Sequence, residues 1–397
     1  MKREFYRISR LPPYVFAEVN RLKAEARKRG DDIIDMGMGN PDAPTPQHIV
    51  DKLCETANKD PKSHRYSVSQ GLYGLRKAVS GYYKRRFDVD INPDKEVAVS
   101  LGSKEAYAHL AMAISKPGDN VIVPNPCYPI HEFGFTLAGA KVQYVARDFK
   151  ANDPQGHLLT QMKKSIKELS PKPLAVVVNY PCNPTAETAT LEFYEELVDF
   201  CHKEDVIIIS DLAYCELYFD GNPPPSILQI PKARDIAVEL TTVSKTYSMA
   251  GWRVGFTVGN EDIIYALKRL KSYLDYGAFT PIQVAAAAAL NGPQECVEEA
   301  RQRYKQRRDV LVQGLHDAGW EVTIPTASMF VWAEIPEKFK HMGSVEFSKM
   351  LIQKAKVAVS PGIGFGEHGD NYVRIALIEN RHRIRQAVRN IKQALKS

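Results

Sequence analysis

The sequence lacks the marks of secreted, membrane-embedded and disulfide-stabilised proteins. Its first residues, Met1-Lys-Arg-Glu-Phe5, carry no apolar segment of a secretory signal. No stretch approaches the uninterrupted apolar length of a membrane span. The six cysteines form no Cys-x-x-Cys pair, so neither a zinc site nor a redox site is expected, nor any other metal. We therefore expect a cytoplasmic protein with reduced thiols and no membrane partner.

Internal repeats, low-complexity tracts and an obvious linker are also missing. The 397 residues exceed what one hydrophobic core usually carries, so two lobes are expected. The net charge is +6, and the clearest basic run is Arg301–Arg308. Its cations alternate with polar residues, as on a solvent-exposed helix face, so we do not expect a nucleic-acid partner.

Short apolar runs rich in β-branched residues recur through the first three quarters of the chain, separated by helical patterns. Near-continuous apolar strands between helices predict a mostly parallel sheet covered on both faces. The expected strands are Val97–Leu101, Val121–Val123, Leu174–Val178, Val206–Ser210, Ala237–Val243 and Val254–Val258. The expected helices are Ser103–Ile114, Thr190–Lys203 and Gln283–Leu290.

The last hundred residues have a different pattern. A long charged helix over 295–318 precedes three runs, 329–334, 356–360 and 372–377, which alternate like an exposed sheet, and a helix over 381–395 follows. This pattern predicts a second α+β lobe, against which the first forty residues pack. The predicted division is residues 1–45 and 295–397 for the smaller domain and 46–294 for the larger.

The most informative segment is Thr242-Val-Ser-Lys-Thr-Tyr-Ser-Met-Ala-Gly-Trp-Arg-Val-Gly255. Small and hydroxylated residues surround Lys245, and desolvation there would lower its pKa and free the amine to form a Schiff base. Arg253 can grip a phosphate with both arms of its guanidinium, and Thr242 and Ser244 supply hydroxyls. An incidental surface lysine would not explain this combination.

The segment resembles the lysine motif of the class I/II aminotransferases, which depend on pyridoxal phosphate (PLP), although Thr242 stands where serine or glycine is commoner. The resemblance implies PLP fold type I, an α/β architecture. Its large domain has a mostly parallel seven-stranded sheet between helices, and a smaller α+β domain is built from both termini. It further implies that Lys245 carries the cofactor and moves the substrate proton, while Arg253, Thr242 and Ser244 contact the cofactor.

Two further segments resemble motifs of this family in the expected order. Asn179-Tyr-Pro-Cys-Asn-Pro-Thr185 is similar to its Asn-Pro-Thr-Gly turn, which implies that Asn183 hydrogen-bonds the O3′ atom of PLP. Ala186 replaces the usual glycine, so the backbone geometry of the turn is open. Asp211 ends a buried strand and could cap a helix. The resemblance instead implies that it pairs with the pyridinium nitrogen, and that Tyr214 hydrogen-bonds O3′.

The expected phosphate site is Ser100-Leu-Gly-Ser-Lys104, which ends a strand and begins a helix. Free N–H groups at a helix N-terminus bind phosphate, and in the family register Gly102, Ser103 and Lys104 become its ligands. Tyr128 matches the aromatic residue that stacks on the cofactor ring. Without that register, a core aromatic is an equally good interpretation of Tyr128.

Four positions are assigned to the substrate and to the neighbouring subunit by resemblance. Tyr66 matches a tyrosine that reaches the phosphate of the partner, which implies a homodimer with shared active sites. Gly39 matches a loop glycine near the substrate carboxylate, and Arg374 the arginine that clamps it. Tyr14 resembles a residue of the active-site entrance, where it would narrow the pocket, or it merely packs the N-terminal segment.

The resemblance extends from about Arg10 to Lys392 and implies ping-pong transfer of an amino group between small amino acids and 2-oxo acids. The segments 10–16, 271–277, 360–366 and 374–380 are similar to bacterial glutamate–pyruvate aminotransferases, so we expect alanine synthesis from glutamate and pyruvate. Diaminopimelate, aspartate and aromatic aminotransferases are the alternatives. A PLP lyase would keep Lys245 and Asp211, and a DNA-binding regulator would need an added module that we do not expect here.

Overall fold

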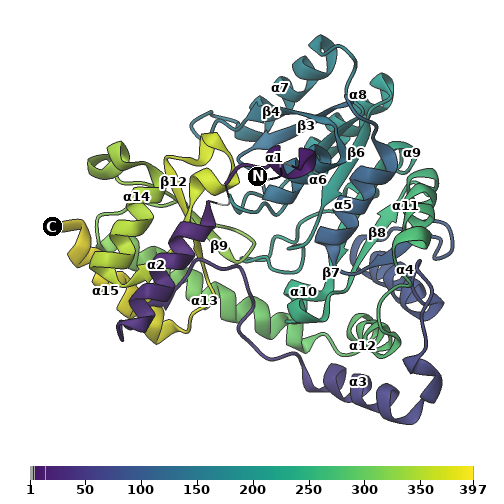
Figure 1. Cartoon of the computed structure of the whole chain (residues 1–397), viewed down its shortest axis with the longest axis horizontal. Helices are drawn as coiled ribbons and strands as arrows, with labels where there is room; N and C mark the ends of the chain where they lie inside the picture. Colours follow the sequence, from purple (N-terminus) through teal and green to yellow (C-terminus); the bar gives the residue numbers. More distant parts are fainter. Residues whose placement is uncertain (1–2, 4, 14, 397) are drawn as a thin grey trace.

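The computed structural model describes residues 3, 5–13 and 15–396, which form two lobes (Figure 1). The larger lobe holds a seven-stranded sheet of order β2-β8-β7-β6-β5-β3-β4. Neighbouring strands are parallel except that β8 runs antiparallel to β2 and β7. The mostly parallel sheet expected from the sequence is therefore confirmed. Its strands are β2 (Val97–Ser100), β3 (Asn120–Asn125), β4 (Lys141–Ala146), β5 (Ala175–Asn179), β6 (Ile207–Asp211), β7 (Ala237–Thr242) and β8 (Gly255–Gly259).

Strand β4 is the one strand of this sheet that has no counterpart among the apolar runs of the sequence. It lies at the edge of the sheet and pairs only with β3. Most of its residues are exposed or half-buried, including Tyr144. An edge strand needs little apolar surface, and therefore its sequence lacks the continuous hydrophobic pattern of the central strands.

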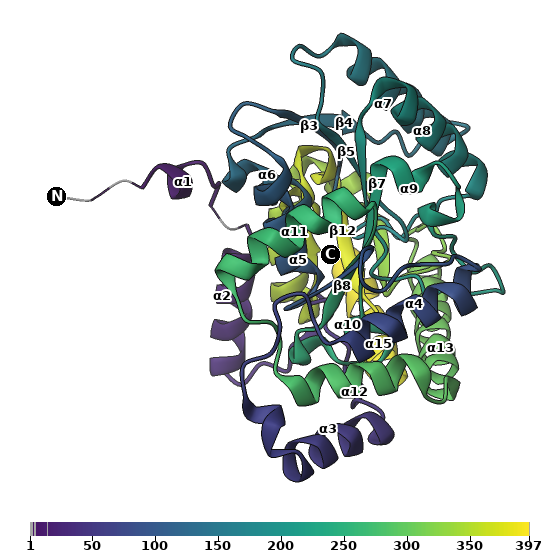
Figure 2. The ribbon, with the colours of Figure 1, turned by 90° about the vertical axis from the view of Figure 1, so that its right-hand side faces the viewer.

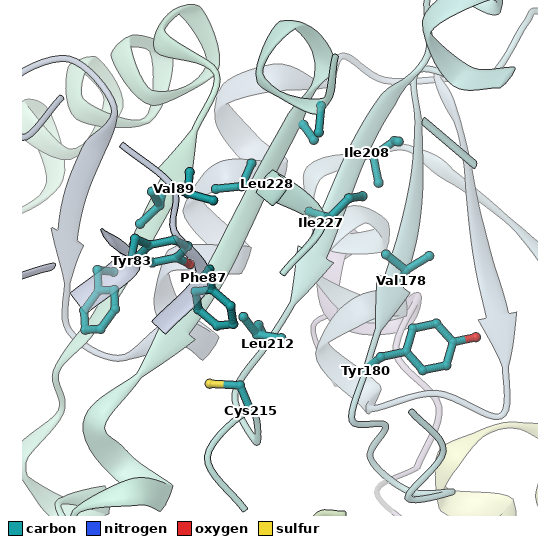
Figure 3. Packing of buried hydrophobic residues seen from close by; sticks show 14 of the residues in the cluster. Tyr83, Phe87, Val89, Val178, Tyr180, Ile208, Leu212, Cys215, Ile227 and Leu228 are labelled. Carbon is teal, nitrogen blue, oxygen red and sulfur yellow. The ribbon is translucent and has the colours of Figure 1, made fainter. Parts of the chain in front are cut away.

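Helices cover both faces of the sheet. One face is covered by α5 (Ser103–Ile114), α6 (Pro129–Ala138) and α11 (Glu261–Leu274). The other is covered by α4 (Tyr73–Phe87), α7 (Pro154–Glu168), α8 (Leu191–Glu204), α9 (Ala233–Ile236) and α12 (Thr280–Asn291), with α3 (Gln47–Lys59) packed on α12. Successive strand residues contribute to opposite faces: Val121 and Val123 to the first, Ile122 to the second. Figure 3 shows the second face, where Tyr83 and Phe87 of α4 lie near Leu212.

The smaller lobe contains a three-stranded antiparallel sheet of order β11-β12-β9. Its elements are α13 (Glu295–Asp317), β9 (Phe330–Glu334), α14 (Gly343–Met350), β11 (Ser360–Pro361), β12 (Tyr372–Ala376) and α15 (Arg381–Lys396). The expectation of an exposed sheet was wrong, since nearly all residues of β9 and β12 are buried. They share one apolar cluster with residues of α13, α14 and α15. These helices therefore cover the sheet face that the alternating pattern suggested was exposed to solvent.

The N-terminal segment packs against the smaller lobe, as expected. Helix α2 (Phe16–Lys28) contributes Val19 and Ala26 to a small apolar cluster with Ile352 and Ala358. Strand β1 (Ile34–Asp35) then pairs in parallel with β10 (Val357–Ala358). The short helix α1 (Tyr6–Ser9) stands away from both lobes (Figure 2). The domain boundaries at 45 and 294 stay predictions.

Several short helices complete the chain. They are η1 (Pro61–His64), η2 (Ile227–Gln229), α10 (Val243–Thr246), η3 (Ala250–Trp252), η4 (Glu337–Met342), η5 (Leu351–Ala355), η6 (Gly362–Phe365) and η7 (Glu367–Gly369). Within the described ranges, no helix combines the length and apolar character needed to cross a bilayer.

The basic run of α13 is not the solvated helix face that its sequence suggested. Arg307 and Arg308 are both buried. Arg307 donates from both arms to the carboxylate of Asp42, with two N–O distances of 2.7 Å. Arg308 donates to Asp220 at 2.7 Å and to the Pro325 carbonyl at 2.9 Å. These forked contacts tie α13 to the N-terminal segment and to the loop after β6.

A buried carboxyl group, Glu239, lies in the middle of the large sheet on β7 and is 0% exposed. One of its oxygens accepts hydrogen bonds from the Ser226 and Tyr83 hydroxyls, at 2.6 and 3.0 Å. The other accepts from the Ser210 hydroxyl at 3.1 Å and the Ile227 N–H at 3.2 Å. Desolvation raises the pKa of Glu239 to about 7, although the hydrogen bonds oppose that rise.

This raised pKa predicts a characteristic pH dependence of stability. Between the ordinary pKa of 4.5 and about 7, the folded protein holds a proton on Glu239 that the unfolded chain has released. The free energy of unfolding contributed by Glu239 therefore falls as pH rises through this window. The variant Glu239→Gln cannot lose a proton. At about 1.4 kcal/mol per pKa unit, its free energy of unfolding relative to wild type should rise by up to about 3 kcal/mol across the window.

Urea unfolding of both proteins at a series of pH values measures this difference. The control is Glu195→Gln, which removes an exposed carboxylate of α8 and should leave the pH dependence unchanged. A difference between Glu239→Gln and wild type that stays constant from pH 5 to pH 8 would contradict the prediction.

Candidate active site

The predicted site residues converge where the carboxyl ends of three parallel strands face the smaller lobe. Strand β5 ends at Asn179, β6 at Asp211 and β7 at Thr242, on the same edge of the sheet. Ligands of open α/β sheets bind at this edge, because the loops that follow parallel strands meet there. Lys245 follows immediately, in the single turn of α10.

Lys245 is half-buried, next to Gly39 of the N-terminal segment. Its amine donates a hydrogen bond to the carbonyl of Gly39, at 2.8 Å. Burial lowers the pKa of Lys245 to about 8, and the positive charges of Arg374 and Arg253 contribute to the decrease. A substantial fraction of the amine is therefore neutral near neutral pH, as a nucleophile or base requires. Gly39 fits only without a side chain, because a Cβ there would lie 2.6 Å from the Phe330 ring.

A cradle suited to phosphate lies between β2, α5 and the segment that follows α10. Gly102 has a φ of +94°, and a Cβ on it would lie 2.2 Å from a guanidinium nitrogen of Arg253. A Cβ on Gly255 would lie 2.4 Å from the backbone nitrogen of Ser103. The two glycines thus let Arg253 approach the N-terminus of α5, whose first N–H groups, including that of Lys104, have no partner within the helix.

Hydroxyl groups hold the lysine turn in place. The Thr242 hydroxyl accepts a hydrogen bond from the Ser244 N–H at 3.1 Å and lies 2.8 Å from the Ser244 hydroxyl. It donates to the carbonyl of Val254 at 2.7 Å. Because Val254 follows Arg253, this contact connects the Lys245 turn to the phosphate cradle. The Thr242 hydroxyl thus makes contacts that the hydroxyl of the commoner serine could also make.

Asp211 has a partner that the sequence did not reveal. One carboxylate oxygen lies 2.9 Å from Nε2 of His131, and both residues are buried. The other oxygen accepts from the Ala213 N–H at 3.3 Å. Asn179 donates to the Asp211 carbonyl at 2.8 Å. The carboxylate is therefore fixed in orientation at the edge of the sheet.

His131 belongs to α6, one turn after Tyr128, and the two rings are 5.7 Å apart. Tyr128 is the N-cap residue of α6 and His131 lies in its first turn, so a histidine just after the predicted stacking tyrosine was the available signal. Tyr128 also lies near the phosphate cradle: the Lys104 ammonium is 5.8 Å from the centre of its ring.

Arg374 joins the smaller lobe to the site. It is buried in β12 and donates to the Asn183 side-chain oxygen at 2.7 Å and to the Gly37 carbonyl at 2.9 Å. Its guanidinium lies 4.1 Å from the ring centre of Phe330 and 4.7 Å from that of Phe365. Such aromatic contacts stabilise a desolvated cation. The arginine side chain is held in a defined place from which it can grip a carboxylate.

Tyr214 packs against Phe330, one of the two phenylalanines that contact Arg374. Its ring centre is 5.6 Å from that of Phe330, and burial raises its pKa. The phenol is therefore protonated near neutral pH and can donate a hydrogen bond.

The turn after Asn183 has alanine at position 186, yet this residue keeps the backbone conformation that the glycine of the family motif would favour. Ala186 has a φ of +62°, in the left-handed region. Its N–H donates to the Cys182 carbonyl at 2.9 Å, and the Cys182 N–H donates to Glu187 at 2.8 Å. The turn is thus closed in spite of the substitution, at a conformational cost of about 1–2 kcal/mol for a residue with a Cβ.

One of the predicted positions that the structure describes, Tyr66, is not brought to Lys245 within this chain. Tyr66 is on the surface and 86% exposed, with its ring 4.7 Å from that of Tyr276. Tyr14 lies outside the described residues, so its predicted place at the pocket entrance stays a prediction.

Comparison with known proteins gives a consistent result. A family model described as aminotransferase class I and II matches residues 31–391. The chain is 58% identical over 394 residues to a putative aminotransferase AatC of Rhizobium meliloti, covering 99% of this chain and 96% of the relative. It is 54% identical over 395 residues to the glutamate-pyruvate aminotransferase AlaC of Escherichia coli, covering 98% and 93%.

More distant similarities cover the chain equally well. An LL-diaminopimelate aminotransferase of Moorella thermoacetica is 41% identical over 392 residues, covering 99% of this chain and 98% of the relative. Among solved structures, substrate-bound BacF of Bacillus subtilis superposes with a TM-score of 0.88 at 34% identity, covering 99% of this chain and 98% of that one.

The strained turn generates a prediction. Ala186→Gly should raise the free energy of unfolding by up to about 1 kcal/mol, because relief of the left-handed strain exceeds the entropy that glycine adds to the unfolded chain. The matched control is Ala189→Gly, three residues further on, where φ is not positive and glycine should destabilise. Urea unfolding of the two variants beside wild type measures both effects, and a destabilised Ala186→Gly would contradict the strain argument.

Proposed function

This chain belongs to the class I and II aminotransferases, which depend on pyridoxal phosphate, and on that premise we propose that it transfers the amino group of glutamate to pyruvate and so makes alanine. The choice of acceptor depends on one observation: identity is 54% to a protein named glutamate-pyruvate aminotransferase and 41% to an LL-diaminopimelate aminotransferase, at similar coverage. Diaminopimelate, aspartate and aromatic substrates are the alternatives.

The residues of the site fit the cofactor. The cradle formed by Gly102, Arg253 and the N-terminus of α5 suits a phosphate, because two glycines there leave space that a Cβ would fill. The buried amine of Lys245 suits the aldehyde. Asp211, fixed by His131, suits the ring nitrogen. When bound, the cofactor supplies an electron sink for the substrate's α-carbon.

Further contacts are proposed with three parts of PLP: the O3′ atom, the ring face and the phosphate. Asn183 and Tyr214 would hydrogen-bond the O3′ atom, for which the protonated phenol of Tyr214 is a suitable donor. Tyr128 would stack on the ring face, next to Lys104. Ser103, Ser244 and Thr242 would complete the surroundings of the phosphate, directly or by holding the turn.

Lys245 moves the proton of the reaction. With its pKa lowered to about 8, the free amine of Lys245 could take a proton from the substrate's α-carbon and return it to the C4′ carbon of the bound cofactor. Arg374 grips the α-carboxylate and so aims the C–H bond at Lys245. Asp211 holds a proton on the ring nitrogen. The same groups act in both half-reactions, so donor and acceptor use one site in turn, which gives ping-pong kinetics.

The surroundings of Arg374 suit a small apolar substituent on the acceptor. Phe330 and Phe365 flank its guanidinium, and Phe16 of α2 packs against Phe365 with ring centres 5.5 Å apart. Removing a methyl group from water to pack beside these rings is favourable, whereas a polar side chain there would lose hydrogen bonds to water. This supports pyruvate as acceptor, and Tyr14 would narrow the same entrance.

The protein acts, in this proposal, as a homodimer with shared active sites. Four exposed side chains, Tyr66, Val68, Tyr276 and Phe279, form an apolar area that we term the Tyr66 surface. Tyr66 packs on Tyr276, and a Cβ on Gly277, which lies between Tyr276 and Phe279 in the chain, would touch the carbonyl of Val68. Exposed aromatic patches mark protein interfaces. Tyr66 of each subunit would reach the phosphate cradle of the other.

We also propose a cytoplasmic location. All six cysteines are free, although six thiols would suffice for three disulfides in an oxidising compartment.

The first test concerns the acceptor. With glutamate as donor, kcat/KM should be at least about tenfold higher for pyruvate than for oxaloacetate, phenylpyruvate or tetrahydrodipicolinate, since each added polar or bulky group costs at least about 1.4 kcal/mol against the aromatic wall. The control is Lys245→Ala, which should be inactive with every acceptor. Another acceptor that equals or exceeds pyruvate would refute the alanine assignment.

Incubating the holoenzyme with glutamate and no acceptor distinguishes a transaminase from a lyase. A transaminase releases one equivalent of 2-oxoglutarate per site and then stops, whereas a lyase continues to turn over.

The second test concerns the shared site. Mixing Tyr66→Phe with Lys245→Ala gives hybrid dimers in which one site lacks both groups and the other is intact. Turnover per Lys245-bearing site should return to the wild-type value, because the intact site receives Tyr66 from the Lys245→Ala subunit. If Tyr66 serves its own subunit, turnover will stay at the level of the Tyr66→Phe parent. Subunit exchange is verified by differently tagged chains.

A further inference from the structure

A cluster of charged side chains is enclosed between α5 and α11, which pack against each other (Figure 2). Lys271 of α11 is 0% exposed. Its ammonium lies 2.8 Å from a carboxylate oxygen of Asp275 and 3.6 Å from one of Glu105. His109 of α5 lies 2.7 Å from the same Glu105 oxygen. Burying a lysine is costly, so a fully enclosed ammonium with two carboxylates indicates a built arrangement.

The cation of this cluster is Lys271 itself. Glu105, His109 and Asp275 could offer metal ligands, since their atoms lie within 4.8 Å of one another. The ammonium already bonds to Asp275 at the distance of a charge-assisted hydrogen bond and neutralises the neighbouring Glu105. A divalent ion would have to displace it. The cluster is therefore better explained by what it holds in place than by a ligand.

The first structure held by the cluster is the turn of the phosphate cradle. The second carboxylate oxygen of Glu105 accepts a hydrogen bond from the Leu101 N–H at 3.1 Å. Leu101 directly precedes Gly102, whose α-carbon faces the Arg253 guanidinium. The carboxylate of Glu105 thus holds the backbone of this turn, and the ammonium of Lys271 in turn holds the Glu105 side chain in position.

The second structure is the turn that supports the Tyr66 surface. The other oxygen of Asp275 accepts from the Gly277 N–H at 2.7 Å. Gly277 has a φ of +79° and packs so closely on Val68 that a Cβ would lie 2.4 Å from the Val68 carbonyl. Tyr276, which lies between Asp275 and Gly277 in the chain, packs against Tyr66. Asp275 therefore sets the position of the segment that carries Tyr66.

We propose that Lys271 is a positioning residue that fixes two phosphate-binding elements at once: the Leu101–Lys104 turn of its own subunit, through Glu105, and Tyr66, through Asp275. The first half of this proposal, the effect through Glu105 on the Leu101–Lys104 turn, does not depend on dimerisation. The second half, the effect through Asp275 on Tyr66, rests on the homodimer proposed above, in which Tyr66 contributes to the partner's site. Each phosphate site of the dimer then depends on two lysines, the Lys271 of its own subunit and that of the other subunit. Lys271 touches neither cofactor nor substrate in this role.

The test compares PLP with pyridoxal, which lacks the phosphate. Removing Lys271 should weaken the grip on phosphate and leave the aldehyde site intact. For Lys271→Met, the affinity of the cofactor-stripped full chain for PLP should fall about 10- to 100-fold, as expected for losing a hydrogen bond that involves a charge, while the affinity for pyridoxal stays unchanged. The holoenzyme should release PLP correspondingly faster. A merely structural role would change both affinities alike.

The matched control is Lys268→Met. Lys268 lies one turn earlier on α11, half-buried, and donates to the carbonyl of Asp94. This variant should keep the wild-type ratio of PLP to pyridoxal affinity. If Lys271→Met does not fold, Glu105→Gln decides the first half. It keeps volume and an acceptor for Leu101 but loses the charge, and should lower the ratio in the same direction. An unchanged ratio in Glu105→Gln and in any folded Lys271→Met would overturn the proposal.

The second half is tested in hybrid dimers. Asp275→Asn is placed on the Lys245→Ala subunit, so that the one site able to hold PLP covalently receives Tyr66 from the altered chain. Its PLP release should be faster than in a hybrid without Asp275→Asn, and an equal rate would overturn this half. The ratio of PLP affinity to pyridoxal affinity in Glu105→Gln does not depend on dimerisation or on the acceptor. The effect through Glu105 is therefore tested independently, even if the proposed homodimer or the proposed acceptor is wrong.

Discussion

The desolvation of one amine, Lys245, is the constraint on which the rest of the site depends. Two cations, Arg374 and Arg253, lie near it, and in the proposed function they hold the anionic groups of substrate and cofactor. Burial and these two charges together lower the pKa of Lys245 to about 8. The groups proposed to bind the ligands therefore also help to make the lysine a base. No separate device is needed to activate it.

This arrangement requires close approach of segments that are far apart in the chain, and glycine permits that approach at two points. Gly39 brings the N-terminal segment to Lys245 under the Phe330 ring, and Gly102 lets Arg253 lie over the start of α5. The lobes meet at the Arg374–Asn183 hydrogen bond, which links β12 to the turn after β5. That turn keeps its left-handed residue even with alanine at 186, which indicates that its geometry is constrained by its surroundings.

The sequence predicted the elements whose information is local. The continuous apolar strands, Lys245 after β7 and Asp211 at the end of β6 follow from periodicity and motif. It did not reveal His131 beside Asp211 or the Lys271 cluster, because these pairings are between separate elements. It also misjudged Arg307 and Arg308. Their charge suggested exposure, whereas forked contacts with Asp42 and Asp220 compensate for their burial. An isolated charge pattern cannot show whether a partner is folded against it.

In the proposed function, chemistry and choice of substrate are controlled by different parts of this protein. Lys245, Asp211 and Arg374 would act on atoms that every 2-amino acid shares, so none of them would distinguish one acceptor from another. Discrimination would come from the residues around the variable side chain, for which Phe330 and Phe365 of the smaller lobe and Phe16 of α2 are the candidates. Substitutions in α2 and β9 would then change the acceptor while the proton transfer at Lys245 stays the same. The names of the relatives agree with this separation, since one named for pyruvate and one named for diaminopimelate are both similar to this chain over nearly its whole length.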